Sequence, residues 1–290
     1  MSPAAMPAAL RRHAWLTVAG LVIVAGLLAF VWGPWRDSGF VEHRMLRRTD
    51  IPAAIAVAPD GAVWFTIEMS DALGVHRHGK IERLSKQTPN LESLGLDVDA
   101  DGGVWYTDAS ARAVARMAAD GSIRSFPLTT PIVRLGRLAV APDRAVWFAD
   151  ATTASVTRLK DGVFTRHVSR SSGAVPWGVA VDARGTVWAT LPNVNRLARI
   201  AGDGQVTEFD VPTRGSGLGD VAVDASGAVW FSELRSGRLG RLRDGRVTEF
   251  RLPRPDARPF GVTVDRANNV WYTDLGGWLG MLRADYATGG

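Results

Sequence analysis

The chain has 290 residues, a formal net charge of +5 and no cysteine, so disulfide bonds and thiolate metal sites are excluded. Its length is sufficient for one domain with a sizeable hydrophobic core plus a short additional segment. The positive charge comes from arginines scattered along the chain rather than from a basic run. We therefore expect no nucleic-acid partner, and only a weak attraction to anionic lipid headgroups.

The first predicted element is a membrane-spanning helix. The 19 residues 14–32 carry no charge and are dense in Leu, Val, Ile, Ala and Gly, and about 20 such residues span a bilayer. Arg11 and Arg12 precede them, which favours a transmembrane signal anchor over residues 14–35 with residues 1–13 in the cytoplasm. A cleaved signal peptide is the alternative, although the bulky residues after the apolar stretch offer no small-x-small cleavage site. Either way, the rest of the chain is expected on the periplasmic side of the inner membrane.

A tryptophan recurs at intervals of 41 or 42 residues through the rest of the chain, each time preceded by valine. The six ladder tryptophans are Trp64, Trp105, Trp147, Trp188, Trp230 and Trp271. A fixed period of this length marks an array of one supersecondary unit whose copies bury their faces against one another. The ladder therefore predicts six repeats.

Each repeat contains four short stretches with the period-two alternation of strands, separated by turn residues. Examples are residues 178–182, 187–190, 238–242 and 247–250, with glycine-rich turns between such stretches. Four strands in a repeat of about 42 residues are typical of a β-propeller blade. The sequence thus predicts an all-β fold, a six-bladed β-propeller of four-stranded blades over residues 36–290.

The ring is expected to be closed by a strand near the start of the propeller. Glu249 lies 22 residues before Trp271, in the fourth strand of a repeat, and the same offset before Trp64 leads to Glu42. Only one further strand fits after Trp271. Residues 40–45 are therefore expected to supply the outer strand of the last blade, which removes an exposed sheet edge.

The repeat resembles that of the streptogramin B (virginiamycin B) lyases over residues 40 to 285. The closest match is Gly-Ala-Val-Trp-Phe-Ser-Glu at 227–233, Gly-Arg-Leu-Gly-Arg-Leu at 237–242 and Val-Thr-Glu-Phe-Arg-Leu-Pro at 247–253. The resemblance implies a metal-assisted enzyme that opens an ester-linked ring by elimination. It also implies a histidine in a Glu-x-His-Gly turn before the first strand of a blade, and a glutamate just after Trp-Phe.

The histidine of that resemblance would fall eleven residues before a ladder tryptophan. The residues at those positions are Ala53, Leu94, Gly136, Trp177, Gly219 and Phe260. Trp177 and Phe260 keep the turn, with an aromatic ring in place of the imidazole, and Glu92 stands where the glutamate of the turn could lie. These two aromatic residues are expected either to stack on a ligand at a mouth on the propeller axis or to pack between neighbouring blades.

A set of acids follows the ladder. Three residues after ladder tryptophans stand Asp108, Asp150, Glu233 and Asp274. Equivalent positions of a closed propeller lie at one end of the blades, and hard cations such as Mg²⁺ or Ca²⁺ prefer carboxylate oxygens. The last three acids are therefore expected to bind such a cation. The alternative is that the acids accept hydrogen bonds from neighbouring turns, or pair with Arg134, Arg137 and Arg258.

Two classes of function remain open. In the first, the protein binds a small ligand or a protein partner at the mouth. The residues expected to bind that ligand are Trp177, Phe260, Asp108, Asp150, Asp274, Glu92 and Arg134. In the second, it is a metal-dependent lyase or lactone hydrolase that opens ester-linked rings, as in the inactivation of streptogramin-type antibiotics, with Glu233 and Asp220 as catalytic carboxylates. The missing histidine favours the first class.

Overall fold

The computed structural model describes residues 38–70, 72–85, 95–108, 111–118, 120, 122–129 and 134–287. Residues Gly39–Gly290 form one compact unit, to which Met1–Ser38 do not belong. The predicted transmembrane anchor lies outside the described residues. Within the described residues, no helix is long and apolar enough to cross a membrane.

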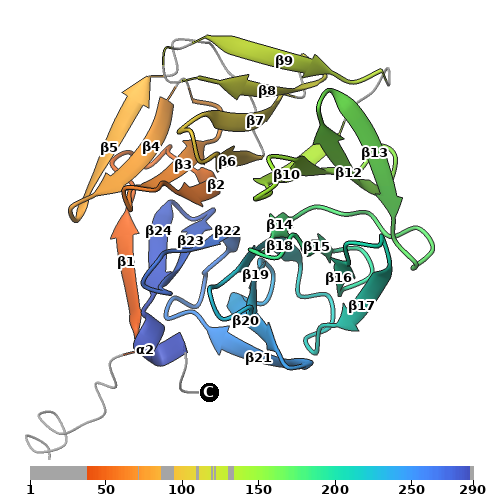
Figure 1. Ribbon diagram of the computed structural model, residues 1–290. Helices are drawn as coiled ribbons and strands as arrows, with labels where there is room; N and C mark the ends of the chain where they lie inside the picture. Colours follow the sequence, from red (N-terminus) through yellow and green to blue (C-terminus); the bar gives the residue numbers. More distant parts are fainter. Residues whose placement is uncertain are drawn as a thin grey trace, which may run out of the picture. The chain divides into compact units, whose positions relative to one another are not determined.

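The described residues form six four-stranded antiparallel sheets, arranged as the blades of a ring in Figure 1. The first blade contains β2 (Pro52–Val57), β3 (Val63–Ile67), β4 (Ala72–Arg77) and β5 (Lys80–Ser85). The second blade contains β6 (Leu96–Val98), β7 (Val104–Asp108), β8 (Ala113–Met117) and β9 (Ile123–Pro127). The third blade contains β10 (Leu135–Val140), β11 (Val146–Asp150), β12 (Ser155–Lys160) and β13 (Val163–Val168). The fourth blade contains β14 (Val179–Val181), β15 (Val187–Leu191), β16 (Arg196–Ile200) and β17 (Val206–Asp210). The fifth blade contains β18 (Leu218–Val223), β19 (Val229–Glu233), β20 (Arg238–Arg243) and β21 (Arg246–Arg251). The sixth blade contains β22 (Pro259–Val264), β23 (Val270–Asp274), β24 (Trp278–Leu282) and β1 (Phe40–Arg44), and helix α2 (Ala284–Ala287) follows β24. The predicted six-bladed propeller is confirmed.

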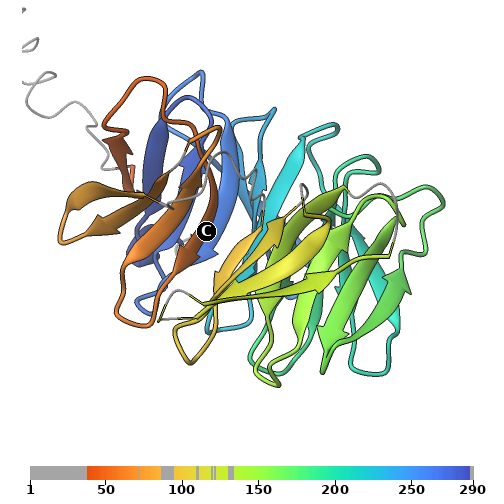
Figure 2. The same ribbon diagram turned by 90° about the horizontal axis from the view of Figure 1, so that it is seen from above.

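The first strand of each blade lies on the inside of the ring (Figure 1). In Figure 2 the strands run between the two end faces of the ring, and the connecting turns lie at those faces. Because every inner strand starts at the same face, residues at equivalent positions of the repeat lie at the same height along the axis. The offsets from the ladder therefore locate positions on the axis.

An aspartate six residues before a ladder tryptophan fixes both the first turn of the blade and the indole. In the fifth blade, Trp230 Nε1 donates to Oδ2 of Asp224 at 3.0 Å. Oδ1 of Asp224 accepts the backbone N–H groups of Ser226 and Ala228 at 2.9 and 3.0 Å. The same indole contact recurs at 2.9 Å in the second and sixth blades. The side chain of one residue thus links the turn to the ladder.

The ladder tryptophans fill the space between neighbouring blades. Trp230 is 1% exposed and belongs to a core cluster with Val262, Val270 and Tyr272 of the last blade. Its ring centre lies 5.4 Å from that of Phe250 in the fourth strand of its own blade. Each blade therefore buries its apolar face against the next blade, which is why the repeat occurs as a closed array.

Strand β1 closes the ring by pairing antiparallel with β24, which confirms the predicted closing strand. The carboxylate of Glu42 accepts hydrogen bonds from Tyr272 Oη at 2.8 Å and from Arg254 Nε at 3.1 Å. Arg254 also forms an ion pair with Asp274 at 2.7 Å. The first and last strands are thus joined by a sheet ladder and by a charged hydrogen-bond network.

Candidate functional site

The inner strands enclose a cavity of about 150 Å³ on the propeller axis. Most of its lining consists of alanine, valine and other apolar side chains. Three ionisable residues also line it, namely Arg137 on β10, Asp220 on β18 and Asp97 on β6. Ionisable groups in an otherwise apolar cavity are typical of functional sites, so these residues define the candidate site.

Arg137 joins four blades across the axis. Its side chain is 2% exposed, and its Nε lies 3.3 Å from Oδ2 of Asp220 in the fifth blade. Its Nη2 donates to the carbonyl oxygen of Ala53 in the first blade at 3.2 Å, and its guanidinium lies 4.7 Å from the ring centre of Phe260 in the sixth blade. Burial lowers the pKa of Arg137, while the negative charges of Asp220 and Glu68 oppose that shift.

Burial raises the pKa of both axial aspartates. It raises the pKa of Asp220 to about 6, against the opposing effect of the Arg137 cation. Burial also raises the pKa of Asp97 to about 6, and the negative charge of Asp220 adds to the rise. The hydrogen bonds that Asp97 accepts from the N–H groups of Val140 and Val98, at 2.8 Å each, oppose it. A carboxylate with a pKa near neutrality can take up a proton at physiological pH, as a general base must.

Trp177 and Phe260 lie together at the face where the inner strands begin. Both side chains are half-buried, and their ring centres are 6.1 Å apart with the planes inclined by 47°. Phe260 packs on the guanidinium of Arg137, whose backbone N–H donates to the carbonyl oxygen of Trp177 at 2.9 Å. The structure therefore brings these two predicted aromatic residues next to the ion pair that contains Asp220. Neither aromatic side chain lines the axial cavity itself.

The acids that follow the ladder tryptophans are buried and hydrogen-bonded to nearby turns. Asp108 accepts the N–H of Ala111 at 2.8 Å. Asp150 accepts the N–H groups of Thr152 and Thr153 at 2.9 and 3.2 Å. Turn N–H groups are thus the main partners of these two carboxylates.

Asp274 is engaged in a similar way. It accepts the N–H of Arg258 at 2.6 Å and forms the ion pair with Arg254. Within the part of the chain that the structure describes, no three His, Cys, Asp or Glu side chains are grouped so that they could hold a metal ion. Cation binding by Asp150, Glu233 and Asp274 stays a prediction.

Glu233 has a distinct electrostatic environment. It is fully buried at the end of β19, and its Oε2 accepts a hydrogen bond from Ser236 Oγ at 2.8 Å. Burial raises its pKa to about 7; the negative charge of Glu249 adds to the rise, and Arg238 opposes it. The two predicted catalytic carboxylates thus have different surroundings, because Asp220 faces the axis and Glu233 contacts the turn after β19.

The two remaining predicted residues lie apart from the axial ions. Arg134 is exposed directly before β10, where its backbone N–H donates to Thr152 Oγ1 at 2.8 Å. Glu92 lies outside the described residues. The sequence analysis missed Asp97 as a site residue. A usable signal existed, because Asp97 stands eight residues before Trp105. Four of the other five blades have alanine at that position, as Ala56, Ala139, Ala180 and Ala222, and the sixth has Thr263.

Comparison with known proteins identifies one family. The model of the virginiamycin B lyase family matches residues 38–286. A virginiamycin B lyase from Nocardia farcinica (strain IFM 10152) is 34% identical over 192 residues, which span 66% of this chain and 66% of that protein, just under two thirds of its length.

Three solved structures share the fold. A catalytically inactive histidine-to-alanine variant of virginiamycin B lyase from Staphylococcus aureus, with quinupristin, has 22% identity and a TM-score of 0.66 over 83% of this chain and 98% of that chain. A gluconolactonase from Xanthomonas campestris has 20% identity and a TM-score of 0.68, covering 83% and 89%. Regucalcin, a calcium-binding protein from Agrobacterium tumefaciens str. C58, has 17% identity and a TM-score of 0.67, covering 82% and 92%. At these low sequence identities, the three solved structures show only that the fold is shared. The family model, in contrast, matches most of the chain. The protein therefore belongs to the virginiamycin B lyase family.

Proposed function

We propose that this propeller binds a small cyclic ligand at the face formed by Trp177 and Phe260. The observation that carries the proposal is the half-buried aromatic pair, whose Phe260 ring packs on the Arg137 guanidinium. Two neighbouring aromatic rings, one of them packed on a buried cation, offer a surface for stacking, which suits the ring of a cyclic ligand. Cyclic depsipeptides have this chemistry.

The positions of the histidines favour binding over histidine-dependent elimination. The chain has five, at positions 13, 43, 76, 78 and 167. Among the described histidines, His43 and His167 lie on the outer strands β1 and β13 of their blades, and His76 lies on the third strand β4. His78 lies in the turn after β4. No imidazole therefore stands where the resemblance requires a general base, and Trp177 and Phe260 occupy two of those positions.

The first test is quinupristin binding to the full-length protein in detergent, measured by titration calorimetry. We expect saturable binding to the wild type, and binding at least about tenfold weaker for Trp177→Ala and for Phe260→Ala, because each change removes one stacking surface. Tyr286→Ala removes an exposed aromatic residue on α2 and is the matched control. Equal affinity in all four proteins would exclude the aromatic pair as the binding site.

A second candidate function is ring opening, and the raised pKa of Asp220 favours it. In elimination, Asp220 would take a proton from the carbon next to the C–O bond, the bond would break, and a linear product of unchanged mass would leave. Lactone hydrolysis would instead add one water. A divalent cation such as Mg²⁺ or Ca²⁺ would polarise the ester carbonyl, and the structural neighbour regucalcin is a calcium-binding protein.

Mass spectrometry of the same quinupristin incubations separates these reactions. A linear product that forms with Mg²⁺ or Ca²⁺, is absent with a chelator, and is lost in Asp220→Asn or Glu233→Gln would establish the enzyme. Binding without any product would leave ligand binding as the function.

We further propose that residues 14–35 anchor the propeller to the inner membrane, with residues 1–13 in the cytoplasm and the propeller in the periplasm. The uncharged stretch 14–32 and the preceding Arg11 and Arg12 support this. Full-length protein is expected to stay in carbonate-washed membranes and to be digested by protease added to spheroplasts. A shorter mature chain in the soluble periplasmic fraction would instead identify a cleaved signal peptide.

A further inference from the structure

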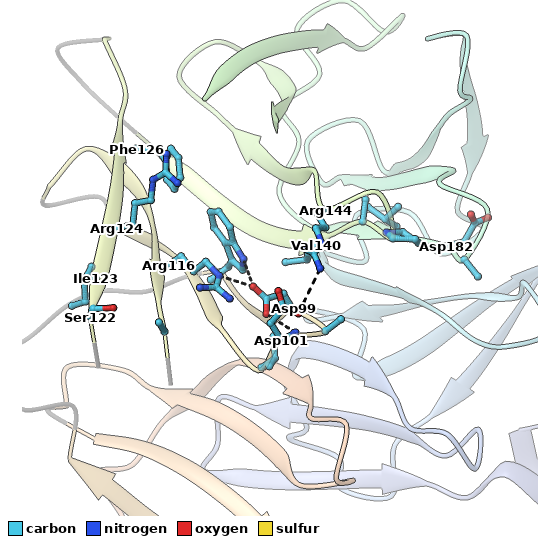
Figure 3. A pocket seen from close by; sticks show the side chains of 18 residues that line it. Asp99, Asp101, Arg116, Ser122, Ile123, Arg124, Phe126, Val140, Arg144 and Asp182 are labelled. Atoms are coloured by element: carbon cyan, nitrogen blue, oxygen red, sulfur yellow. Dashed lines mark hydrogen bonds and ion pairs between the residues drawn. The ribbon is translucent and has the colours of Figure 1, made fainter. Parts of the chain in front are cut away.

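A cleft of about 790 Å³ lies between the second and third blades, at the face opposite to Trp177 and Phe260. Figure 3 shows it from close by, with Arg116 and Arg124 on the side of the second blade and Arg144 on the side of the third. Its apolar lining includes Phe126, Val140 and Val181, from the second, third and fourth blades. The aspartates Asp99, Asp101 and Asp182 line it together with the arginines. The volume is within the range of small-molecule sites, roughly 300–1,000 Å³.

Arg144 adopts a backbone conformation that side chains rarely take. Its φ is 65°, in the turn between β10 and β11. The other blades place residues suited to this conformation at the equivalent position, namely Gly61, Gly102, Gly185, Gly227 and Asn268, all with positive φ. A strained residue that persists where glycine would relieve it is typical of a functional position. Arg144 is thus the one member of this set that places a long cationic side chain on a positive-φ backbone position.

Two of the three arginines at the cleft are open to a ligand. Arg116 is held by Asp99 at 2.6 Å. The Nη2 of Arg144 lies 3.6 Å from Asp101, and both side chains are well exposed, at 79% and 59%, so this pair is loose. The guanidinium of Arg124 lies 4.9 Å above the ring of Phe126. No ion pair links Arg124 to a carboxylate within the described part of the chain.

The equivalent cleft between the third and fourth blades provides a comparison. It is smaller, about 500 Å³. Of the arginines that line it, Arg158 is bound to Asp143 at 2.8 Å, whereas no ion pair links Arg184 to a carboxylate within the described residues. The turn position that corresponds to Arg144 is glycine there, at Gly185. The larger cleft therefore differs from its neighbour in its volume and in having an arginine with positive φ at this turn position.

We propose that the cleft between the second and third blades binds a small organic anion. Its carboxylate or phosphate group accepts hydrogen bonds from Arg124 and Arg144, one from each blade. The apolar part of the anion packs against Val140 and Phe126. This site is separate from the aromatic pair at the opposite face and does not depend on the function proposed for that pair.

The test is titration calorimetry of the full-length protein with benzoate, phenyl phosphate and inorganic phosphate. Saturable binding of at least one of the two organic anions is expected, and about tenfold or greater weakening in Arg124→Ala and in Arg144→Gly. Arg144→Gly should also melt at the same or a higher temperature than the wild type, because glycine accepts positive φ without strain. Loss of binding in a variant that is no less stable separates the ligand contact from folding.

Arg166→Ala is the matched control, since Arg166 is an exposed arginine on β13 that lines neither cleft. Its affinity should equal that of the wild type, as should that of Trp177→Ala, which alters only the opposite face. Tighter binding of phenyl phosphate than of inorganic phosphate would assign part of the affinity to the apolar contacts. Absence of saturable binding by the organic anions, or unchanged binding in Arg124→Ala and Arg144→Gly, would overturn the proposal.

Discussion

Replacement of Arg137 by alanine is expected to lower the free energy of unfolding by about 3–5 kcal/mol, because it leaves the buried carboxylate of Asp220 without its cation. The change also removes the hydrogen bond to Ala53 and the packing against Phe260, so four blades lose a common contact. Urea-induced unfolding of the full-length protein at pH 7 measures the loss.

Two comparisons give this result its meaning. Arg134→Ala removes an exposed arginine three residues earlier and should change stability by no more than about 0.5 kcal/mol. The double variant Arg137→Met with Asp220→Leu should recover most of the stability, since an apolar pair avoids the cost of burying two ions. A loss below about 1 kcal/mol for a correctly folded Arg137→Ala protein would contradict the bridging role.

The second large effect is a dependence of stability on pH through Asp97. Its pKa of about 6 in the folded protein exceeds its ordinary value of 3.8, so the folded state binds the proton more tightly than the unfolded state. The resulting stabilisation is complete below pH 3.8 and is lost as pH rises toward 6. A shift of about two pKa units corresponds to about 3 kcal/mol between pH 4 and pH 7.

Asp97→Asn isolates this contribution because asparagine does not titrate. Lost hydrogen bonding to Val140 or Val98 lowers the stability of the variant equally at both pH values. The difference between wild type and variant should therefore change by about 3 kcal/mol between pH 4 and pH 7. Asp256→Asn, at an exposed carboxylate, serves as control. Parallel pH profiles of wild type and Asp97→Asn would show that Asp97 does not titrate in this range.

The sequence predicted the blades well because their signals are local. Turn residues, strand alternation and the constant ladder spacing each depend on neighbouring positions of the chain. Even the closing strand was predictable, since Glu42 keeps the offset that Glu249 has from the next ladder tryptophan. Because the six repeats copy one unit, equivalent positions can be compared within this single sequence.

The axial site was less predictable because it depends on the direction of side chains. Asp150, like its equivalents, was placed correctly at the end of a second strand, but its partners there are the N–H groups of the next turn. Alternate residues of a strand point to opposite faces of the sheet, so an offset from the ladder gives the height of a residue along the axis but not the groups that its side chain contacts. The reach of Arg137 across the ring to Asp220 joins residues of two different blades, which no local pattern indicates.

The pairing of β1 with β24 also sets an order of events during synthesis. The first five blades are built from consecutive hairpins, whereas Glu42 meets Tyr272, 230 residues later, only when the chain is nearly complete. At about 5–20 residues per second, translation leaves the first strand without its partner for roughly 10–50 s. Charged residues such as Glu42 and Arg44 on that strand discourage pairing with other chains meanwhile. A chain that ends before residue 278 lacks β24, so β1 stays unpaired and the last blade keeps an open sheet edge. The ring can therefore close only after translation has nearly finished.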